Sequence, residues 1–539
     1  MKEKRPFSAF MPLMLSLALV AGLFIGRSME QSRTVIPTFL FPQGASASEK
    51  VGQVIDLIDR QYVDSVRKGE LVDEVIQDLL QHLDPHSYYI SANELRAAQE
   101  PLEGSFEGIG VEFAIQHDTV VVIAPVEGGP SAALGIRAGD RIISANTKAM
   151  AGVGITNEQV MEHLRGPGGS EVTVGILRRG NTKPFDVRIA RGKIPINSVA
   201  VSLLRPDATG YIKLVRFART THEEFVRAAE DLKAKGMRRL VLDLRGNGGG
   251  YLNAAIDLAD EFLPDGRKIV YTEGRTHPRQ DYLATSKGLL EQMPLAVLID
   301  EGSASASEIL AGAVQDNDRG LVVGRRSFGK GLVQEHLELP DQSAVRLTTA
   351  RYYTPSGRSI QRPYGEGIDY NEEFEARFDH GELLSKDSIS LDSSKIYRTL
   401  AGRTVFGGGG IMPDVFVPAD TTESSRYLTE LFFSGALNQF AFDLADRDRE
   451  KFEAFGNAAA LRDRFQVDEK MLNELSTYAA SEGIKEQPGD RERSWHAIGS
   501  RLKAGIARNI WGAPGYYGLL LDDDNLFLRA RERLTQDAQ

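Results

Sequence analysis

The chain has 539 residues, of which 42% are hydrophobic and 26% are charged, a balance typical of an ordinary globular protein. Its net charge of -11, with no long basic run, argues against a nucleic-acid partner. The absence of cysteine excludes disulfides, thiolate metal sites and a cysteine nucleophile, and the 9 histidines have no metal-ligand spacing, so we expect neither a metal nor an organic cofactor.

The N-terminus differs in composition from the rest of the chain. Basic residues precede a nearly uncharged stretch, residues 7 to 26, which Arg27 closes. A helix of about 20 residues can cross a hydrocarbon core of about 30 Å, whereas a cleaved signal peptide has an apolar region of only about 7 to 15 residues. We therefore predict a signal anchor over residues 1 to 27, and a membrane-anchored protein whose catalytic part lies in the periplasm or another extracytoplasmic space. The small residues at 45 to 47 leave a distant cleavage site as the alternative.

Two regions of different periodicity follow a polar linker at residues 28 to 47. Residues 48 to 104 have apolar side chains three and four positions apart, which predicts an N-terminal helical region. Between residues 105 and 192 the period changes to two, and a single amphipathic helix at 156 to 166 interrupts the strands. This second region is predicted to be a compact β-rich module.

The rest of the chain divides into a mixed region and a helical one. Residues 193 to 420 alternate between strand and helix patterns, which predicts an α/β core with parallel strands. Within it, residues 362 to 405 are polar and are expected to be an irregular insertion. Residues 421 to 539 form a charged helical region with an aromatic-rich break at 511 to 518.

Three alternating serines occupy the turn "DEGSASASEILAG", residues 300 to 312, between a predicted strand and a predicted helix. Ligands of open α/β sheets bind at such junctions. Ser307, followed by Glu308, is predicted to cap the helix, which leaves Ser303 and Ser305 in the turn. A hydroxyl there lies at the positive end of the helix dipole, beside N–H groups that can hold an oxyanion. A simple turn of small residues remains the alternative.

A serine nucleophile needs a base, and no histidine occurs between His277 and His336. Lys330, between two glycines in "SFGKGLVQE", can serve only if burial lowers its pKa from about 10.4. An exposed lysine in a turn is the alternative interpretation. The glycine-rich turn in "VLDLRGNGGGY", residues 241 to 251, has N–H groups that can bind a phosphate or an oxyanion.

Together with "ARYYTPSGRSIQ" (350 to 361) and "GIMPDV" (410 to 415), these blocks resemble the C-terminal processing peptidases, serine proteases with a serine-lysine dyad. The resemblance implies a parallel-sheet core of the ClpP/crotonase type. It further implies that Ser305 is the nucleophile, that Lys330 is the base and that Gln334 orients the base. The implied oxyanion donors are the N–H groups of Ala306 and of either Gly249 or Gly250. Because an extended strand separates residues i and i+4 by about 13 Å, contact between the lysine and the glutamine requires a bend.

The β-rich module resembles the PDZ domain that precedes the catalytic core in this family. In "GIGVEF", the N–H groups of Gly108, Ile109, Gly110 and Val111 can hold a terminal carboxylate, while an exposed strand edge pairs with the end of a peptide. Arg165 stands where some family members couple peptide binding to the active site. A spacer or an assembly surface is the alternative role for the module.

The sequence therefore predicts an exported serine endopeptidase that binds substrates by their C-termini and cleaves them with a Ser-Lys dyad. The helical regions at 48 to 104 and 421 to 539 are expected to contribute to self-association. A non-catalytic PDZ scaffold or adaptor in the cell envelope is the alternative from another class, and an esterase is a second one.

Overall fold

The computed structural model describes residues 47–365 and 367–536, together with Ser16, Val20 and Gly22. The chain divides into two compact units, Met1–Asp78 and Leu79–Gln539. In the first unit, α2 (Ala47–Gln61) and the start of α3 (Lys68–Gln81) are amphipathic helices. An ion pair between Lys68 and Asp56, 2.6 Å long, joins them.

The prediction of a membrane-anchored localisation is wrong on the present structure. In the described part of the chain, no helix is both long and apolar enough to cross a membrane. The longest described helix, α16 (Asp490–Leu520), carries charged side chains from Asp490 to Arg508, which a hydrocarbon core disfavours. The stretch from 7 to 26 lies outside the described residues, apart from the three named above.

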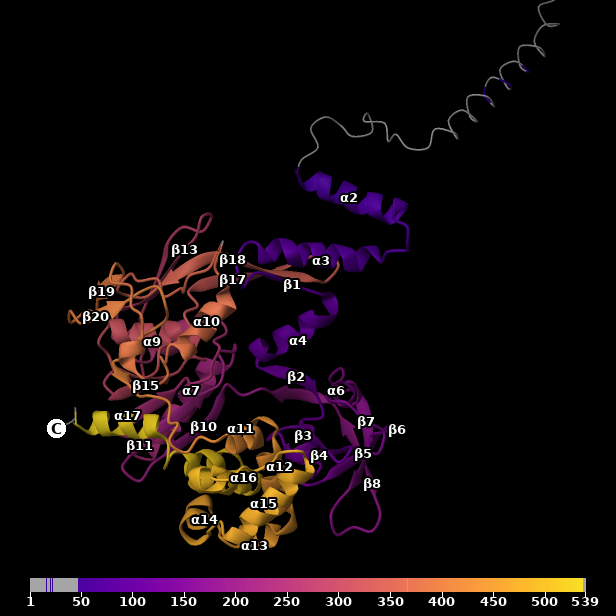
Figure 1. The fold of residues 1–539 in the computed structure, drawn as a ribbon, viewed down its shortest axis with the longest axis vertical. Coiled ribbons are helices and arrows are strands. Elements are labelled where there is room, and N and C mark those ends of the chain that lie inside the picture. Colours follow the sequence, from indigo (N-terminus) through magenta and orange to yellow (C-terminus); the bar gives the residue numbers. More distant parts are fainter. Residues whose placement is uncertain (1–15, 17–19, 21, 23–46, 366, 537–539) are drawn as a thin grey trace, which may run out of the picture. The chain divides into compact units, whose positions relative to one another are not determined.

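The centre of the second unit is a six-stranded sheet (Figure 1). In spatial order its strands are β10 (Val199–Leu204), β11 (Thr209–Leu214), β12 (Arg239–Asp243), β15 (Leu295–Ile299), β16 (Leu321–Gly324) and β21 (Val415–Phe416). Only the edge strand β10 is antiparallel to its neighbour, and the other pairs are parallel. All residues of β15 are buried and apolar, as expected for a parallel strand covered on both faces.

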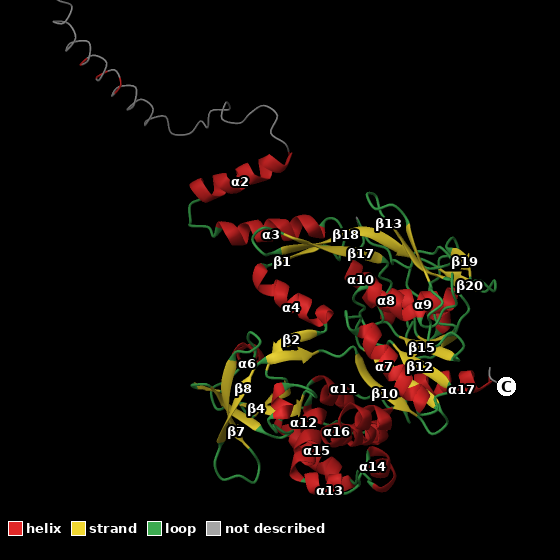
Figure 2. Cartoon of the chain, turned by 180° about the vertical axis from the view of Figure 1, so that it is seen from behind, coloured by secondary structure: helices red, strands yellow, loops and turns green. Residues whose placement is uncertain are grey.

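Helices cover both faces of this sheet (Figure 2). On one face, Leu240 and Leu242 of β12 pack in a core with α7 (Thr221–Ala234), α8 (Leu252–Asp260) and α9 (Ala306–Asp316). On the other face, Val241 packs in a core with α17 (Asn525–Gln536). Because side chains alternate along a strand, each strand contributes to both cores. The last helix of the chain thus covers the sheet that carries the serine turn, residues 300 to 312.

A second sheet of the same unit is antiparallel. Its members are β1 (Tyr88–Ile90), β13 (Lys268–Glu273), β14 (Gln280–Leu283), β17 (Leu332–Glu338) and β18 (Ala344–Tyr353). β18 pairs with β1, β13 and β17, whereas β17 pairs with β18 alone. β17 follows directly after the Lys330 segment, so the second sheet holds that segment from one side.

The β-rich module has its own sheet and core. Its strands are β3 (Val111–Gln116), β4 (Thr119–Pro125), β5 (Arg141–Ala145), β6 (Lys148–Ala149), β7 (Glu171–Leu177) and β8 (Phe185–Ala190), with helices α5 (Pro130–Ala133) and α6 (Asn157–Leu164). β2 (Ser105–Gly108) and β9 (Gly192–Pro195) form the antiparallel pair through which the chain enters and leaves the module. Helix α4 (Ala92–Glu103) precedes this entrance.

The C-terminal stretch is helical, as its sequence pattern indicates. It contains α11 (Arg426–Phe433), α12 (Ala436–Arg447), α13 (Arg449–Glu453), α14 (Ala458–Arg464), α15 (Glu469–Ser481), α16 and α17. α16 is interrupted at Gly512, within the break expected at 511 to 518. Ion pairs link these helices to the β-rich module, between Arg508 and Glu112 (2.6 Å) and between Asp446 and Arg179 (3.2 Å).

Residues 362 to 405 are more ordered than their polar composition suggests. They contain α10 (Tyr370–Asp379), a short 3₁₀ helix (Lys386–Ser388) and the hairpin β19 (Ile396–Arg398) and β20 (Thr404–Phe406). The buried Arg377 of α10 donates to the carbonyl of Ser327 at 3.2 Å. The expected irregular insertion is therefore wrong, because its polar side chains are used inside the protein to support the segment before Lys330.

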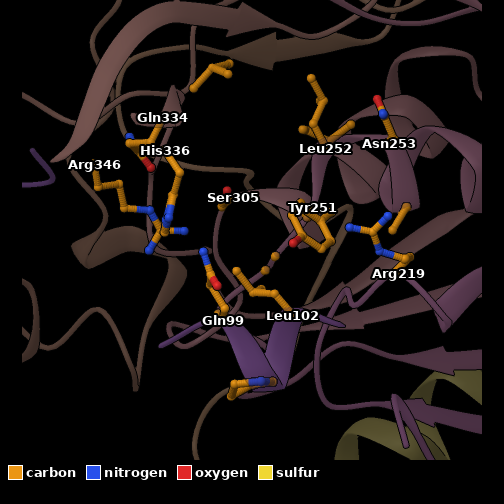
Figure 3. A pocket seen from close by; sticks show the side chains of 18 of the residues that line it. Gln99, Leu102, Arg219, Tyr251, Leu252, Asn253, Ser305, Gln334, His336 and Arg346 are labelled. Atoms are coloured by element: carbon orange, nitrogen blue, oxygen red, sulfur yellow. The ribbon is translucent and has the colours of Figure 1, made fainter. Parts of the chain in front are cut away.

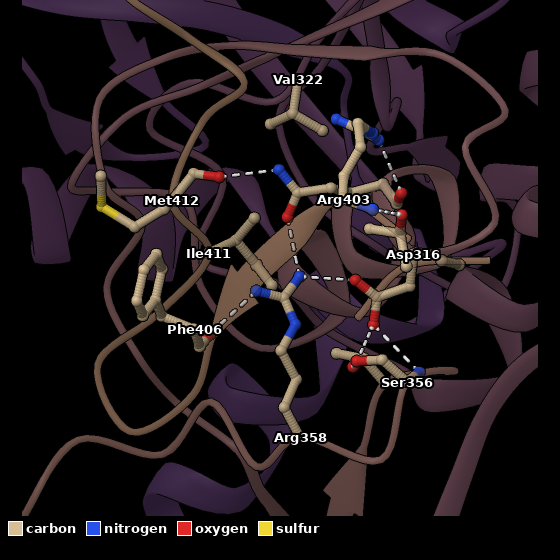
Figure 4. A network of polar contacts seen from close by, with 12 residues as sticks. Asp316, Val322, Ser356, Arg358, Arg403, Phe406, Ile411 and Met412 are labelled. Carbon is tan, nitrogen blue, oxygen red and sulfur yellow. Dashed lines mark hydrogen bonds and ion pairs between the residues drawn. The ribbon is translucent and has the colours of Figure 1, made fainter. Parts of the chain in front are cut away.

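A buried polar network holds the C-terminal end of α9 (Figure 4). Arg358 and Asp316 form a fully buried ion pair of 2.7 Å. The same guanidinium donates to Gln315 Oε1 (2.7 Å) and to the carbonyl of Phe406 (2.9 Å), and Ser356 Oγ donates to Asp316 (2.6 Å). Breaking a buried pair by removing one partner costs about 3–5 kcal/mol, so this network fixes the helix firmly.

Candidate active site

The three alternating serines lie between the buried strand β15 and the buried helix α9. Ser303 Oγ donates to the carbonyl of Leu244 (2.8 Å), and Ser307 Oγ donates to the carbonyl of Asn247 (2.8 Å). Both hydroxyls therefore fasten this turn to the neighbouring glycine-rich turn. Ser305 alone of the three lines the large cleft of the second unit.

Ser305, rather than Ser307, is the N-cap residue of α9. The predicted cap at Ser307 is wrong because the Glu308 carboxylate accepts the N–H of Ser305 at 2.8 Å, so the helix starts earlier than expected. The backbone of Ser305 has φ 54° and ψ −114°, a conformation that residues other than glycine rarely adopt. Sharp, strained turns of this kind expose the nucleophile between a strand and a helix in other hydrolases.

A buried carboxylate connects Ser305 to the segment that carries Lys330. Glu308 has no exposed surface, and its Oε2 accepts the N–H groups of Ser305 (2.8 Å) and Lys330 (2.9 Å). Its Oε1 accepts the N–H of Gly329 (2.7 Å) and the hydroxyl of Ser327 (2.5 Å). Burial raises the pKa of Glu308 to about 7, although these hydrogen bonds act to lower it.

A buried hydroxyl joins the same two residues through their carbonyl groups. Tyr352 of β18 is 1% exposed, and its hydroxyl lies within hydrogen-bonding distance of the carbonyl oxygens of Ser305 (3.1 Å) and Lys330. The main chain of each residue is therefore held on both its N–H and its carbonyl side.

Lys330 has the properties that a lysine base requires. Burial, and after it the positive charge of Arg346, lower its pKa to about 8, although the carboxylates of Glu308 and Asp84 act in the opposite direction. Among the described residues, none accepts a hydrogen bond from its amine. A substantial fraction of this amine is neutral near pH 8, when an exposed lysine is almost fully protonated.

Ser305 and Lys330 line one cleft of about 940 Å³. Figure 3 shows Ser305 between two groups of side chains. Gln334, His336 and Arg346 lie on one side, and Tyr251 and Arg219 lie on the other. Helix α4 also contributes side chains to the lining, among them Gln99 and Leu102.

Gln334 lines the same cleft, but its hydrogen bond goes elsewhere. Its amide donates to Thr348 Oγ1 at 3.3 Å, and this hydroxyl donates to Asp84 Oδ1 at 3.2 Å. In the described part of the chain, no hydrogen bond joins Gln334 to Lys330. β17 begins only at Leu332 and is irregular between Val333 and Gln334, so the chain is not fully extended between the two side chains.

The glycine-rich turn approaches Ser305 closely. A Cβ on Gly249, whose φ is 97°, would lie 2.8 Å from Ser305 Cβ and 2.9 Å from the nitrogen of Ala306, so only glycine fits here. The N–H of Gly249 is already donated to Asn247 Oδ1 (2.9 Å). Among the described residues, none accepts a hydrogen bond from the N–H of Gly250 or of Ala306. These two groups therefore remain available to a ligand.

The GIGV loop of the β-rich module turns its carbonyl groups inward. The carbonyl of Ile109 accepts both the N–H (3.1 Å) and the hydroxyl (2.6 Å) of Ser131, and the carbonyl of Gly110 accepts the N–H of Val126 (3.0 Å). Gly108 pairs with Arg165 in an isolated bridge, and Val111 starts β3. The carbonyl oxygens of Ile109 and Gly110 are therefore occupied by hydrogen bonds within the module.

Arg165 links the β-rich module to a helix of the cleft. Its guanidinium forms an ion pair of 2.5 Å with Glu100 of α4 and lies 4.5 Å from the ring centre of Phe106. The neighbouring residue Gln99 lines the cleft. Arg165 therefore pairs with a residue that lies directly beside the lining of the cleft.

Glu308 and Tyr352 are absent from the sites that the sequence predicts. The first had a recognisable signal, because Ser305 followed three residues later by a glutamate matches the capping-box pattern. The second had none, because Tyr352 is one of two adjacent tyrosines in a strand and only the register of β18 decides which of them points inward.

Three parts of the chain match family models. Residues 208–374 match peptidase family S41, and residues 108–189 match the PDZ domain. Residues 427–512 match a family of unknown function, DUF8443. The first match includes Ser305 and Lys330, and the second includes the GIGV loop and Arg165.

Curated proteins and solved structures resemble the chain over most of its length. The carboxy-terminal-processing protease of Bartonella bacilliformis is 36% identical over 347 residues, which are 64% of this chain and 79% of that protein. The carboxy-terminal processing protease CtpB of Bacillus subtilis is 33% identical over 351 residues, 64% of this chain and 72% of that protein. The structure of a photosystem II D1 C-terminal processing protease is 27% identical and covers 70% of this chain and 95% of its own, with a TM-score of 0.35.

Proposed function

The chain belongs to the carboxy-terminal processing proteases of peptidase family S41, and from that premise we propose that Ser305 is its nucleophile and Lys330 its general base. It is a serine peptidase with a PDZ domain. The observation that carries the proposal is the placement of Ser305, at a strained helix start, in one cleft with a buried lysine of lowered pKa.

In this mechanism the neutral amine of Lys330 accepts the proton of Ser305 Oγ while that oxygen attacks the carbonyl carbon of the peptide bond. The C–N bond then breaks, and the lysine ammonium returns the proton to the leaving amine. Water attacks the resulting acyl-enzyme, with Lys330 again as the base, and releases the new C-terminus. No metal or organic cofactor takes part in these steps.

The tetrahedral oxyanion needs donors beside Ser305. We assign this role to the N–H groups of Ala306 and Gly250, since the N–H of Gly249 is donated to Asn247. Gly249 then serves by its small size, which lets the turn approach the nucleophile. Gln334, which lines the cleft and donates a hydrogen bond to Thr348, orients the amine of Lys330.

The PDZ domain presents substrates by their C-termini. The inward carbonyl groups of the GIGV loop support a role for the N–H groups of Gly108, Ile109, Gly110 and Val111 in binding the terminal carboxylate. Through Arg165 and Glu100, occupation of this loop is communicated to α4 and the cleft.

The division into functional parts follows the same scheme. We assign residues 48 to 104 to an N-terminal helical region, 105 to 192 to the PDZ domain, 193 to 420 to the peptidase core and 421 to 539 to a C-terminal helical region, with a linker at 28 to 47. The parallel sheet, covered by helices on both faces, supports a core of the ClpP/crotonase type.

Self-association is proposed for the N-terminal helical region. On α2, Val51, Val54 and Leu57 are exposed by 43%, 48% and 41%, at the spacing of one helix face. A second copy of the chain would cover this face. Replacing Val54 and Leu57 by serine should lower the mass measured by light scattering if the face is an interface, and an unchanged mass would contradict it.

Cleavage assays distinguish this function from its alternatives. The parent protein should cut an unfolded protein that ends in an apolar tail, and the Ser305→Ala and Lys330→Ala variants should lose the activity. A non-catalytic scaffold would bind the tail without cutting it. An esterase would hydrolyse small esters and leave the polypeptide intact.

A further inference from the structure

Glu308 contacts both reactive segments without touching the cleft. It is completely buried, and it is absent from the residues that line the cleft around Ser305 and Lys330. Its carboxylate accepts four hydrogen bonds, one from the nucleophile turn and three from residues 327 to 330. We propose that Glu308 is a positioning residue, which fixes the nucleophile turn and the lysine segment relative to each other. This inference rests on the proposed function.

The number of acceptors makes a carboxylate necessary at this position. Two carboxylate oxygens provide about four lone-pair sites, and all four donors use them. A glutamine has the same shape but only one acceptor oxygen, so its NH₂ group would face N–H donors. Because Ser305 and Lys330 share Oε2, one orientation of the amide in a Glu308→Gln variant would leave both of their N–H groups without an acceptor.

An aspartate would fail for a different reason. It keeps the charge and both oxygens, but it is shorter by one methylene. Bound to the N–H of Ser305, it would withdraw from the lysine segment, whose closest donors lie 2.5 to 2.9 Å from the present carboxylate. The two variants therefore separate the charge of Glu308 from its reach.

The charge has a measurable effect on the lysine. The groups that act on Lys330 are Glu308 from α9, Arg346 from β18 and Asp84 from the segment before β1. The neighbouring His86 has its pKa lowered to about 4, so it stays neutral while the lysine titrates. Since the negative charge of Glu308 raises the pKa of Lys330, its removal should shift the alkaline rise of activity to lower pH.

The chain contains a matched control. Glu224 of α7 also accepts two backbone N–H groups, from Ser198 (2.7 Å) and Val199 (3.0 Å), and one hydroxyl, from Thr220 (2.6 Å). It does not line the cleft. Glu224→Gln therefore removes the same kind of support from another part of the core.

The test measures kcat, KM, the pH profile of kcat/KM and the melting temperature of Glu308→Gln, Glu308→Asp and Glu224→Gln on a tail-bearing substrate. We expect kcat of Glu308→Gln to fall about 100-fold with KM within about threefold, because a small misplacement of catalytic groups has effects of this size. The apparent pKa in the kcat/KM profile of Glu308→Gln should fall. In Glu308→Asp this pKa should remain near the parent value, although kcat should decrease. Glu224→Gln should keep the parent kcat.

The inference is overturned if Glu308→Gln keeps the parent kcat, or if Glu224→Gln loses kcat to the same extent. If Glu308→Gln does not fold, Glu308→Asp alone decides, since it tests reach with the charge retained. Activity that survives in Ser305→Ala would refute the proposed function itself, whatever the Glu308 variants do. Inactive Ser305→Ala and Lys330→Ala variants beside a fully active Glu308→Gln would refute only the positioning role.

Discussion

Ser305 and Lys330 are held to each other by two buried side chains. The Glu308 carboxylate accepts the N–H of both residues, at 2.8 and 2.9 Å, and the Tyr352 hydroxyl lies against the carbonyl oxygen of both. The two residues are 25 positions apart in sequence and belong to different elements. Their relative position is therefore part of the core packing, and it does not depend on a substrate.

Activity should rise with pH through the titration of Lys330. The base must be neutral, and burial lowers the pKa of Lys330 to about 8, so kcat/KM should increase between about pH 6 and about pH 9. The midpoint of the kcat/KM profile, measured on a peptide substrate, reports this pKa in the free enzyme. A flat profile, or a midpoint near the ordinary lysine value of about 10.4, would contradict the assignment.

Lys330→Met should abolish activity and yet stabilise the fold. The lowered pKa means that the unfolded chain holds the lysine proton more tightly, so the parent gains stability as pH rises from about 8 to about 10.5. At pH 7 the parent bears the full cost of burying the Lys330 ammonium group. The free energy of unfolding of the variant should therefore be about 1–3 kcal/mol higher than that of the parent. Denaturant titrations at pH 7 and pH 10.5 should show this difference and its decrease. A variant that is less stable at pH 7 would argue against a buried ammonium.

Ser305→Gly should be more stable than Ser305→Ala. Both variants lack the hydroxyl, but alanine keeps the side chain that makes φ 54° and ψ −114° unfavourable. We expect a difference of about 1 kcal/mol in the free energy of unfolding, measured by denaturant titration, with both proteins inactive. Equal stabilities, or a more stable alanine variant, would show that the turn is not strained.

Arg165→Ala should uncouple the PDZ domain from the cleft. The variant removes the contact with Glu100 and should lower kcat/KM on a protein with an apolar C-terminal tail by about fivefold or more, a typical coupling strength. Cleavage of a short peptide that cannot span both sites should remain at the parent level. Arg188→Ala, which removes a 73% exposed side chain from β8 of the same domain, serves as the control. Equal losses on both substrates would exclude coupling.

Patterns of local origin could be predicted from the sequence. Strand and helix periods indicated the α/β core, and the blocks around Ser305 and Lys330 placed both residues beside a glycine-rich turn, where the structure brings them together in one cleft. Each block depends on a few consecutive residues that need a special backbone or a special chemistry. Such requirements are visible without knowledge of the fold.

Features that depend on long-range contacts could not be predicted. Tyr352 acquires its place from the pairing of β18, and α17 joins the core only because the sheet has an uncovered second face. The sequence around Arg377 in α10 predicted a polar insertion. In the structure, the buried Arg377 forms a hydrogen bond with the carbonyl of Ser327 and an ion pair with Glu382. In each case a partner distant in sequence decides the burial, and composition alone does not reveal it.

The most direct measurement of the central claim is the site of covalent labelling by a fluorophosphonate, located by peptide mass spectrometry. We predict a single modified residue, Ser305, with a labelling rate that rises with pH around the Lys330 pKa of about 8 and is lost in Lys330→Ala. Modification of another residue, or undiminished labelling of Ser305→Ala or Lys330→Ala, would contradict it.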